Sequence, residues 1–541
     1  MQLHDLSFDP LDPYWEIPGG SLRWAVQVFT LSNVYGLEAD AEVQRTDDSI
    51  VVHGEGFTWG AGAFKSGGKL TAEVRREGRA WVWRITAQHA EPIKSIKLLV
   101  RGIPSSHLQS GWWHATTDAG EAQVAGHKTA VQLDYPNAHE WQTPWVAVGT
   151  DDEALTISVR DSKVHATRFF AHTPPWADGE TIAEIICEDD ATQFGTNFEA
   201  PPIRVAELTT SELIFEDFSD HLSHVERVYG LRPWAVRADV PAWARKIRLV
   251  LNLHGQHWTG KIFNTFDDMA QVLRFVSEHI PGEQVIAYLP GWEGRYYWQY
   301  PWFTPAESLG GPDAFARLAA TADELGITLM PMFGAHGANA QIYPQWADAT
   351  FLNTTARYPV LLNKPDWDGD RAGEDDQVFL NTGNPEFRAL LVDQVSAMVR
   401  EYGVRVAYFD TTAAWFNDPR FNLYEGYRSL KNELAHLHPN LMIAGEGWTD
   451  ALLAIFPLNL SWLGSSRTFR RPELLHRYGR AVQHLLDGAP GLGSTGVYEG
   501  GFTLPDRAPV TAGHLRSISF VDNTLQDVAD DVIAICTDAR E

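Results

Sequence analysis

Two acidic residues each close a short apolar run, and their types and spacing suit nucleophilic and acid–base chemistry. Asp410 ends the run 403–410, and Glu446 ends its apolar run at 441–446. A strand that is buried on both faces of an α/β sheet reads as such a continuous apolar run. The segment 421–438 between them carries leucine and tyrosine at near-helical spacing and is closed by Pro439. The pattern predicts a strand–helix–strand unit with parallel, adjacent strands that both end in a carboxylate.

Two carboxylates on neighbouring strand ends can hydrolyse a glycoside with retention. Adjacent strands lie about 4.8 Å apart, and retaining glycosidases hold their two carboxyl groups roughly 5–5.5 Å apart. The shorter Asp410 suits the nucleophile, and Glu446 suits the acid/base because the indole of Trp448 would desolvate it. One strand-end carboxylate alone would more often be a helix cap or an ion-pair partner, but two on consecutive strands favour catalysis.

Further polar and aromatic residues follow the other predicted strands and are candidates for binding a substrate. The aromatic loop 292–302 is the predicted sugar platform, and its alternative interpretation is a packed lid over the barrel mouth. The histidines would donate hydrogen bonds to sugar hydroxyls, although a loop histidine is as often simply solvated. The predicted binding residues are His254, Trp258, Trp292, Glu293, Tyr297, Trp298, His336, Trp415, Trp448 and Asp522.

The elements that position these residues fall into two regions of the 541-residue chain. Residues 1–236 alternate in short strands, as in the half-buried pattern around Leu155 and Thr156, and predict an antiparallel β-sandwich. Residues 237–541 alternate strand and helix and predict a (β/α)₈ barrel. Its predicted strands are 247–253, 285–289, 327–333, 403–410, 441–446, 454–460, 494–498 and 516–521. Its predicted helices are 266–279, 312–325, 385–402, 421–438 and 525–536, and a short helix at 216–229 precedes the boundary.

Composition limits the classes of ligand. The net charge of −27 argues against nucleic acid and anionic membrane as partners and favours neutral or cationic ligands, although it also fits mere solubility. Cys187 and Cys536 are far apart and form no disulfide framework or metal motif. The first residues show no signal peptide and no apolar run is long enough to span a membrane. A cytoplasmic protein is therefore expected, or a secreted one if a leader has been removed.

Several motifs resemble the retaining α-glycosidases of the α-amylase type, and more closely the endo-α-N-acetylgalactosaminidase type. Residues 408–410 are similar to the nucleophile strand, and residues 444–448 to the Gly-Glu-x-Trp segment with the acid/base. Residues 381–388 are similar to the segment before the helix that leads into the nucleophile strand. The resemblance implies a barrel with Asp410 as nucleophile, Glu446 as acid/base and a third carboxylate at Asp522. Tyr408 replaces the amylase arginine, and Thr524 and Leu525 replace a His-Asp pair. These departures leave the third carboxylate open.

The sequence predicts no cofactor. The acidic segment 366–376 lacks the EF-hand spacing, so a solvated loop or a lid is favoured over calcium there. No phosphate loop, Ser-His-Asp signature or zinc spacing is found.

The predicted function is retaining hydrolysis or transglycosylation of an α-glycoside, with a carbohydrate as the partner. The alternative is a non-catalytic carbohydrate-binding or scaffold protein on a degenerate barrel. A lyase or isomerase barrel would ordinarily need a metal cluster or a lysine that the sequence does not offer. The identity of the sugar, endo or exo action and the oligomeric state do not follow from the sequence.

Overall fold

The computed structural model describes the chain in segments that form two compact units, residues 1–230 and 231–541. The sequence pattern predicts the boundary at 236. The described residues are 14–37, 41–60, 62–114, 130–138, 141–150, 152–174, 179–256, 260–294, 301–339, 343–355, 377–461, 473–483, 513–520, 525 and 529–540.

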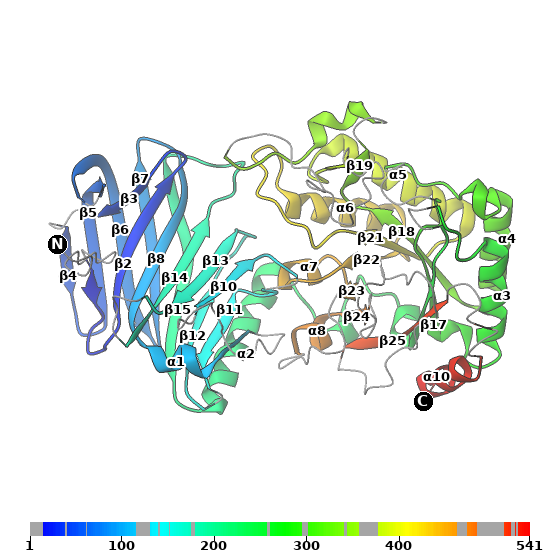
Figure 1. The fold of residues 1–541 in the computed structure, drawn as a ribbon, viewed down its shortest axis with the longest axis horizontal. Helices are drawn as coiled ribbons and strands as arrows, with labels where there is room; N and C mark the ends of the chain where they lie inside the picture. The colour runs from blue at the N-terminus through cyan, green and yellow to red at the C-terminus, as the bar shows by residue number, and fades with distance from the viewer. Residues whose placement is uncertain are drawn as a thin grey trace. The chain divides into compact units, whose positions relative to one another are not determined.

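The first unit is antiparallel β structure, as the alternating sequence predicts (Figure 1). Its strands form one continuous path, β10-β13-β14-β8-β2-β3-β5-β6-β7-β15-β12-β11-β9, with β1 beside β2 and β4 beside β5. The bounds are β1 (Trp15–Glu16), β2 (Arg23–Thr30), β3 (Val34–Leu37), β4 (Glu42–Arg45), β5 (Ser49–Trp59), β6 (Phe64–Glu77), β7 (Ala80–His89), β8 (Ile93–Pro104), α1 (Ser105–Ser110), β9 (Trp112–His114), β10 (Ala130–Tyr135), β11 (Trp145–Gly149), β12 (Ala154–Val159), β13 (Thr167–His172), β14 (Glu180–Glu188), β15 (Asn197–Leu208) and α2 (Ser211–Tyr229).

Two layers of this path face each other across an apolar core. The buried indoles of Trp24 on β2 and Trp83 on β7 meet edge to face, with ring centroids 6.4 Å apart. The prediction of a half-buried strand around residue 155 is wrong in one respect, because Thr156 is buried as fully as Leu155. Helix α2 packs against β11, β12 and β15 and covers the second face of that strand. The alternation of apolar and polar residues in the sequence did not reveal that a helix covers the polar face of this strand.

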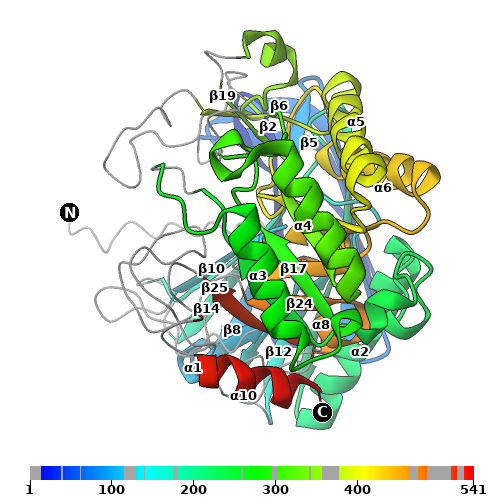
Figure 2. The same ribbon diagram turned by 90° about the vertical axis from the view of Figure 1, so that its right-hand side faces the viewer.

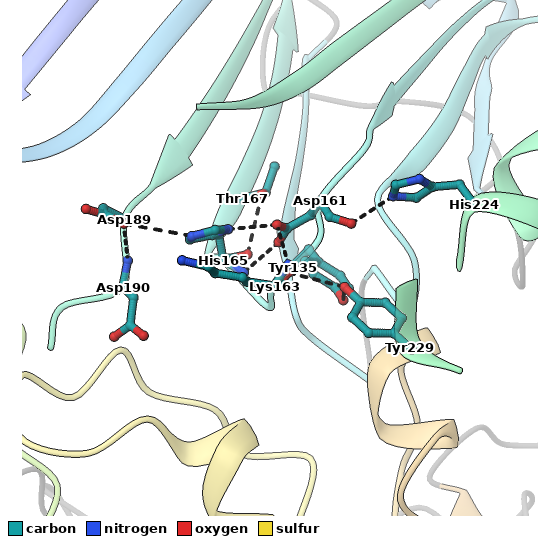
Figure 3. A network of polar contacts seen from close by, with 9 residues as sticks. All are labelled: Tyr135, Asp161, Lys163, His165, Thr167, Asp189, Asp190, His224 and Tyr229. Atoms are coloured by element: carbon teal, nitrogen blue, oxygen red, sulfur yellow. Dashed lines mark hydrogen bonds and ion pairs between the residues drawn. The ribbon is translucent and has the colours of Figure 1, made fainter. Parts of the chain in front are cut away.

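A buried polar network joins loops of the first unit (Figure 3). The imidazole Nδ1 of His165 lies 2.8 Å from Asp161 Oδ1, and its Nε2 lies 3.8 Å from Asp189. Asp161 also accepts backbone N–H bonds from Lys163 and His165, at 2.9 and 2.7 Å. Burial lowers the pKa of His165, but the hydrogen bond and the charge of Asp161 outweigh it and raise this pKa above its usual value. The network thus favours the protonated form of His165 beside the carboxyl groups of Asp161 and Asp189.

The second unit is a closed parallel barrel, as predicted, in the order β16-β17-β18-β21-β22-β23-β24-β25. Helices α3 and α4 lie side by side outside it (Figure 2). The bounds are β16 (Leu249–Leu253), α3 (Phe266–Ser277), β17 (Val285–Leu289), α4 (Gly311–Leu325), β18 (Thr328–Gly334), β19 (Gly337–Asn339), β20 (Gln377–Phe379), α5 (Pro385–Tyr402), β21 (Val406–Asp410), α6 (Leu423–Leu437), β22 (Met442–Glu446), α7 (Asp450–Leu453), β23 (Leu458–Ser461), α8 (Glu473–Tyr478), β24 (Arg480–Gln483), β25 (His514–Phe520) and α10 (Ala529–Arg540). Short 3₁₀ turns lie at Trp234–Val236, Trp243–Lys246, Gly282–Gln284, Glu307–Leu309 and Pro344–Ala349.

Local signals in the sequence set the ends of the barrel helices. The side chain of Asn384 accepts hydrogen bonds from the first turn of α5, and Pro385 follows it at a position that needs no N–H donor. Gly326 ends α4 in the left-handed conformation expected of a C-terminal glycine. Thr265 and Asp268 form a reciprocal capping box at the start of α3. These caps fix where α5 and α3 begin and where α4 ends.

One predicted barrel strand is wrong. The seventh strand is β24, which pairs with β23 and β25 and leaves no position for a strand at 494–498. That segment lies outside the described residues. Because β24 has only four residues and begins with Arg480, its apolar signal is too short to separate it from the end of α8.

Candidate active site

The fourth and fifth barrel strands bring Asp410 and Glu446 to the same rim. Asp410 is the last residue of β21 and Glu446 the last of β22. The two strands pair in parallel with Phe409 opposite Gly445, so the next residue of each is a carboxylate at the matching level. Both are nearly buried, with exposed fractions of 5% and 4%. The carboxyl ends of barrel strands are where barrel enzymes place their chemistry.

Two threonines in the turn after Asp410 are hydrogen-bonded to Glu446. The backbone N–H of Thr411 donates to Glu446 Oε2 at 2.7 Å. The hydroxyl of Thr412 accepts from the N–H of Glu446 at 2.7 Å and donates to its carbonyl oxygen at 2.9 Å. Thr411 has a φ of 62°, a left-handed conformation that is costly for a β-branched residue and is often found at functional sites. The residue after Asp410 therefore orients Glu446.

A third carboxyl, that of Glu293, lies in the turn that follows β17. It is 5% exposed, and neither of its oxygens has a hydrogen-bond partner within the described part of the chain. Burial raises the pKa of Glu293 to about 8; the residue's own backbone N–H acts against this rise, and the negative charge of Asp410 adds to it. Its carboxyl group is therefore mainly un-ionised at neutral pH and lies within electrostatic reach of Asp410.

Two phenols occupy the barrel interior below Asp410. Tyr408 precedes it by two residues, so both side chains point to the same face of β21. The Tyr408 hydroxyl lies 3.5 Å from Asp410 Oδ1, and its ring meets Tyr288 of β17 edge to face at 4.9 Å. Burial, reinforced by the neighbouring acidic groups, raises the pKa of Tyr408 well above its usual value. A neutral phenol thus stands where amylase-type strands carry arginine.

The structure buries His336 completely, although the sequence predicts it as a binding residue. Its Nδ1 lies 2.9 Å from the carbonyl oxygen of Leu380, and its Nε2 makes a short contact with the Tyr427 hydroxyl. A carbonyl can only accept, so we assign the proton to Nδ1, and Nε2 then accepts from Tyr427. Burial lowers the pKa of His336 to about 4, which keeps the ring neutral. Both ring nitrogens are thereby occupied by groups of the protein itself.

Trp292 and His254 are also buried. The indole N–H of Trp292 donates to the carbonyl oxygen of Met332 at 2.7 Å, and its ring packs on Phe315 and Phe333. With no exposed surface it forms part of the packing between the β17 turn and β18 rather than a sugar platform. His254 follows β16 and lies against the Glu293 turn, where a Cβ on Gly291 would come 3.2 Å from its Nε2.

The remaining predicted binding residues divide by position. Trp415 is partly exposed just after Asp410, whereas Trp448 is buried with its ring 6.3 Å from that of His514. Trp258, Tyr297, Trp298 and Asp522 lie outside the described residues, as does the acidic segment 366–376. Within the described ranges, no group of three or more His, Cys, Asp or Glu side chains could hold a metal ion. Among the described helices, none is both long and apolar enough to cross a membrane.

Sequence reasoning missed the residues that organise the site around the two carboxylates. Thr411, Thr412 and Tyr427 have no signal of their own, because their roles depend on contacts between strand ends or with helix α6. Tyr408 could have been found, because its alternation with Asp410 places both on one face of the strand.

No protein-family model matches the chain, and no curated protein matches it. Among solved structures, the ligand-free α-N-acetylgalactosaminidase NagBb from Bifidobacterium bifidum matches with a TM-score of 0.62 at 12% identity, over 97% of this chain and 90% of that one. NagBb in complex with GalNAc matches with a TM-score of 0.60 at 14% identity, over 84% and 76%. The chain shares the fold of NagBb. The predicted likeness to α-glycosidase barrels is confirmed at the level of the fold.

Proposed function

We propose that the chain is a glycoside hydrolase that cleaves an α-glycosidic bond with retention through a covalent glycosyl-enzyme intermediate. The observation that carries the proposal is the pair of carboxyl groups, Asp410 and Glu446, at matching ends of adjacent parallel strands, with the turn after Asp410 hydrogen-bonded to Glu446. The fold shared with NagBb supports it. Paired carboxylates at short range are the requirement of retaining glycosidases.

In the first step, a carboxylate oxygen of Asp410 attacks the anomeric carbon of the bound sugar. The bond from this carbon to the glycosidic oxygen breaks, and Glu446 transfers its proton to that oxygen as the aglycone leaves. An ester between Asp410 and the sugar results. The hydrogen bond from Thr411 to one oxygen of Glu446 holds the plane of the acid during this transfer.

In the second step, Glu446 accepts a proton from a water molecule that attacks the anomeric carbon. The ester bond breaks, Asp410 regains its charge, and the sugar leaves with its original anomeric configuration. If another sugar takes the place of water, the same step is transglycosylation. The buried surroundings of both groups exclude other water and strengthen their electrostatic interaction with the transition state.

For the substrate, we propose an α-linked sugar of galacto configuration, with an N-acetylgalactosaminide tested first. NagBb is by name an α-N-acetylgalactosaminidase, and its structure with GalNAc shares the fold of this chain. The buried carboxyl of Glu293 provides a polar group for a sugar substituent beside Asp410.

The experiment that tests both roles is azide rescue of Asp410→Ala and Glu446→Ala with dinitrophenyl α-N-acetylgalactosaminide and α-galactoside. Without the nucleophile, azide attacks the substrate directly and should give the β-glycosyl azide. Without the acid/base, the activated substrate still forms the intermediate and azide should give the α-glycosyl azide. Asp393→Ala, on the exposed face of α5, is the matched control and should hydrolyse like the wild type.

If Asp410→Ala gave the α-glycosyl azide and Glu446→Ala the β-glycosyl azide, the roles of nucleophile and acid/base would be exchanged. Wild-type turnover with an inverted product would contradict retention. Sugar binding without any turnover by the wild type would favour the non-catalytic carbohydrate-binding protein, which Tyr408 in place of arginine keeps as the alternative.

A further inference from the structure

The Glu293 carboxyl is buried without the hydrogen bonds that buried carboxyls ordinarily have. Neither Oε1 nor Oε2 has a partner among the described residues, and the residue is 5% exposed. A buried polar group left unpaired costs free energy that a folded protein rarely tolerates, and each exception calls for an explanation. A ligand that completes the missing hydrogen bonds is such an explanation.

The turn that carries Glu293 is fixed in place. Gly291 and Gly294 on either side have φ angles of 63° and 93°, which glycine adopts without strain. A Cβ on Gly291 would lie only 2.3 Å from the carbonyl oxygen of Gln256, and one on Gly294 would lie 2.8 Å from Cβ of Ala306. This close packing on both sides holds the turn against its neighbours, so Glu293 is positioned at the rim of the barrel.

The charged surroundings decide the form in which Glu293 binds. Among the described residues, Asp410 of β21 acts on it electrostatically, and His254 of β16 lies against the same turn. No described arginine or lysine forms an ion pair with it. Ionisation would place a second negative charge in a buried site beside Asp410. Burial and that charge raise the pKa of Glu293 to about 8, in agreement with this geometry.

We propose that Glu293 recognises the sugar as an un-ionised carboxylic acid, whose O–H donates to, and whose carbonyl oxygen accepts from, a neutral polar substituent. This inference rests on the proposed function of the same site. A hydroxyl or an acetamido group has the donor and acceptor that a carboxylic acid complements. A protonated amine offers donors alone and would be bound better by a carboxylate.

Two consequences follow for specificity. The site should prefer galactose or N-acetylgalactosamine over galactosamine in its cationic form, because the acid has no charge to offset the buried cation. The neutral acid also adds no second negative charge beside Asp410, the carboxyl group proposed to attack the anomeric carbon.

The test is calorimetric titration of the full chain with N-acetylgalactosamine, galactose and galactosamine at pH 6 and pH 9. Wild-type affinity for the two neutral sugars should fall about tenfold at pH 9, one unit above the pKa of about 8. Glu293→Gln keeps a neutral donor and acceptor, so its affinity should be lower than that of the wild type by less than about tenfold and nearly equal at the two pH values. Glu293→Ala should bind more than about a hundredfold more weakly at both.

Glu307→Gln is the matched control, because this exposed glutamate lies in the same connection between β17 and α4. It should retain the affinity and the pH dependence of the wild type. Infrared difference spectra provide a second readout that needs no turnover. A carbonyl band of an un-ionised carboxyl should be present at pH 6, shift when N-acetylgalactosamine binds and be absent from Glu293→Gln.

Wild-type binding that is independent of pH, combined with its loss in Glu293→Gln, would show an ionised Glu293 and overturn the inference. Tighter binding of galactosamine than of galactose at pH 6 would also overturn it, as would the lack of binding of any of the three sugars. A shifted infrared band with no azide product from any variant would instead support sugar recognition by Glu293 and contradict the proposed hydrolase activity. The two proposals therefore fail separately.

Discussion

Buried carboxylates occur in both units of the protein, and their surroundings differ. In the first unit, Asp161 accepts two backbone N–H bonds and a bond with His165, and Asp189 accepts from the N–H of Asp190 (Figure 3). In the barrel, Glu293 is buried to a similar degree with no partner for either oxygen among the described residues.

Under the role proposed for Glu293, the difference separates a structural use of burial from a functional one. Carboxylates whose hydrogen bonds are complete hold loops in place, and removing one should destabilise the fold. A carboxyl whose hydrogen bonds are missing lowers the stability of the empty protein, and a ligand can supply what is missing. Hydrogen-bond saturation, rather than burial or charge, tells the two cases apart.

The largest effect is expected from Asp410→Asn. The amide cannot form the glycosyl ester, so kcat on an aryl α-glycoside should fall by about a thousandfold or more. The measurement is steady-state hydrolysis, with circular dichroism to confirm an unchanged fold. Activity within tenfold of the wild type would exclude Asp410 as the nucleophile.

Glu293→Gln should stabilise the protein as pH rises. Glu293 is protonated in the folded state up to its pKa of about 8 but ionises in the unfolded chain near pH 4.5. Between these values the folded state binds more protons, so the wild type loses up to about 1.4 kcal/mol of unfolding free energy per pH unit from this group. Glutamine removes that loss. Urea unfolding of the wild type and of Glu293→Gln between pH 5 and 8 measures this difference in unfolding free energy. Parallel pH curves of the two proteins would contradict the interpretation of Glu293 as an unpaired, un-ionised carboxyl group.

Asp161→Asn should destabilise the protein, the opposite of the effect of Glu293→Gln. It breaks the buried network around His165 and should lower the unfolding free energy by about 2–4 kcal/mol. Because the pKa of His165 is raised, its stabilising contribution is complete below about pH 6.5 and is lost as pH rises through the folded-state pKa, so the loss in the variant should be largest at low pH. Chemical unfolding at pH 6 and pH 8.5 tests this, with the exposed Glu199→Gln as control.

Thr412→Val is expected to have the smallest effect. The two hydrogen bonds to the backbone of Glu446 are lost, so the acid should be displaced and kcat should fall about 10- to 100-fold with little change in KM. Thr412→Ser retains the hydroxyl and should recover most of the rate. Equal rates for the valine and serine variants would show that the hydroxyl does not position Glu446.

The sequence predicted the parts of the site that depend on one strand at a time. A continuous apolar run ending in an acid was enough to place Asp410 and Glu446 on consecutive strands, and the alternation of strand and helix was enough for the barrel. Both signals are local, and burial on both faces of a parallel strand enforces them.

The parts that depend on contacts far apart in sequence did not follow. Tyr427, whose hydroxyl contacts the imidazole of His336, is 91 residues away from it in the sequence. The left-handed backbone conformation of Thr411 has no glycine to indicate it. The missing partners of Glu293 also became visible only once every neighbour was in place. Such features are properties of the assembled rim, not of any segment.

The turn at Thr411 and Thr412 also bears on how such a barrel can diverge. Since this short connection ties the end of β21 to Glu446 at the end of β22, neither strand can lengthen or slip by a residue without changing the relative position of Asp410 and Glu446. Under the proposed mechanism, a change at those two residues would alter the spacing that sets the stereochemical outcome, whereas changes in the loops after the other strands would alter sugar preference without it.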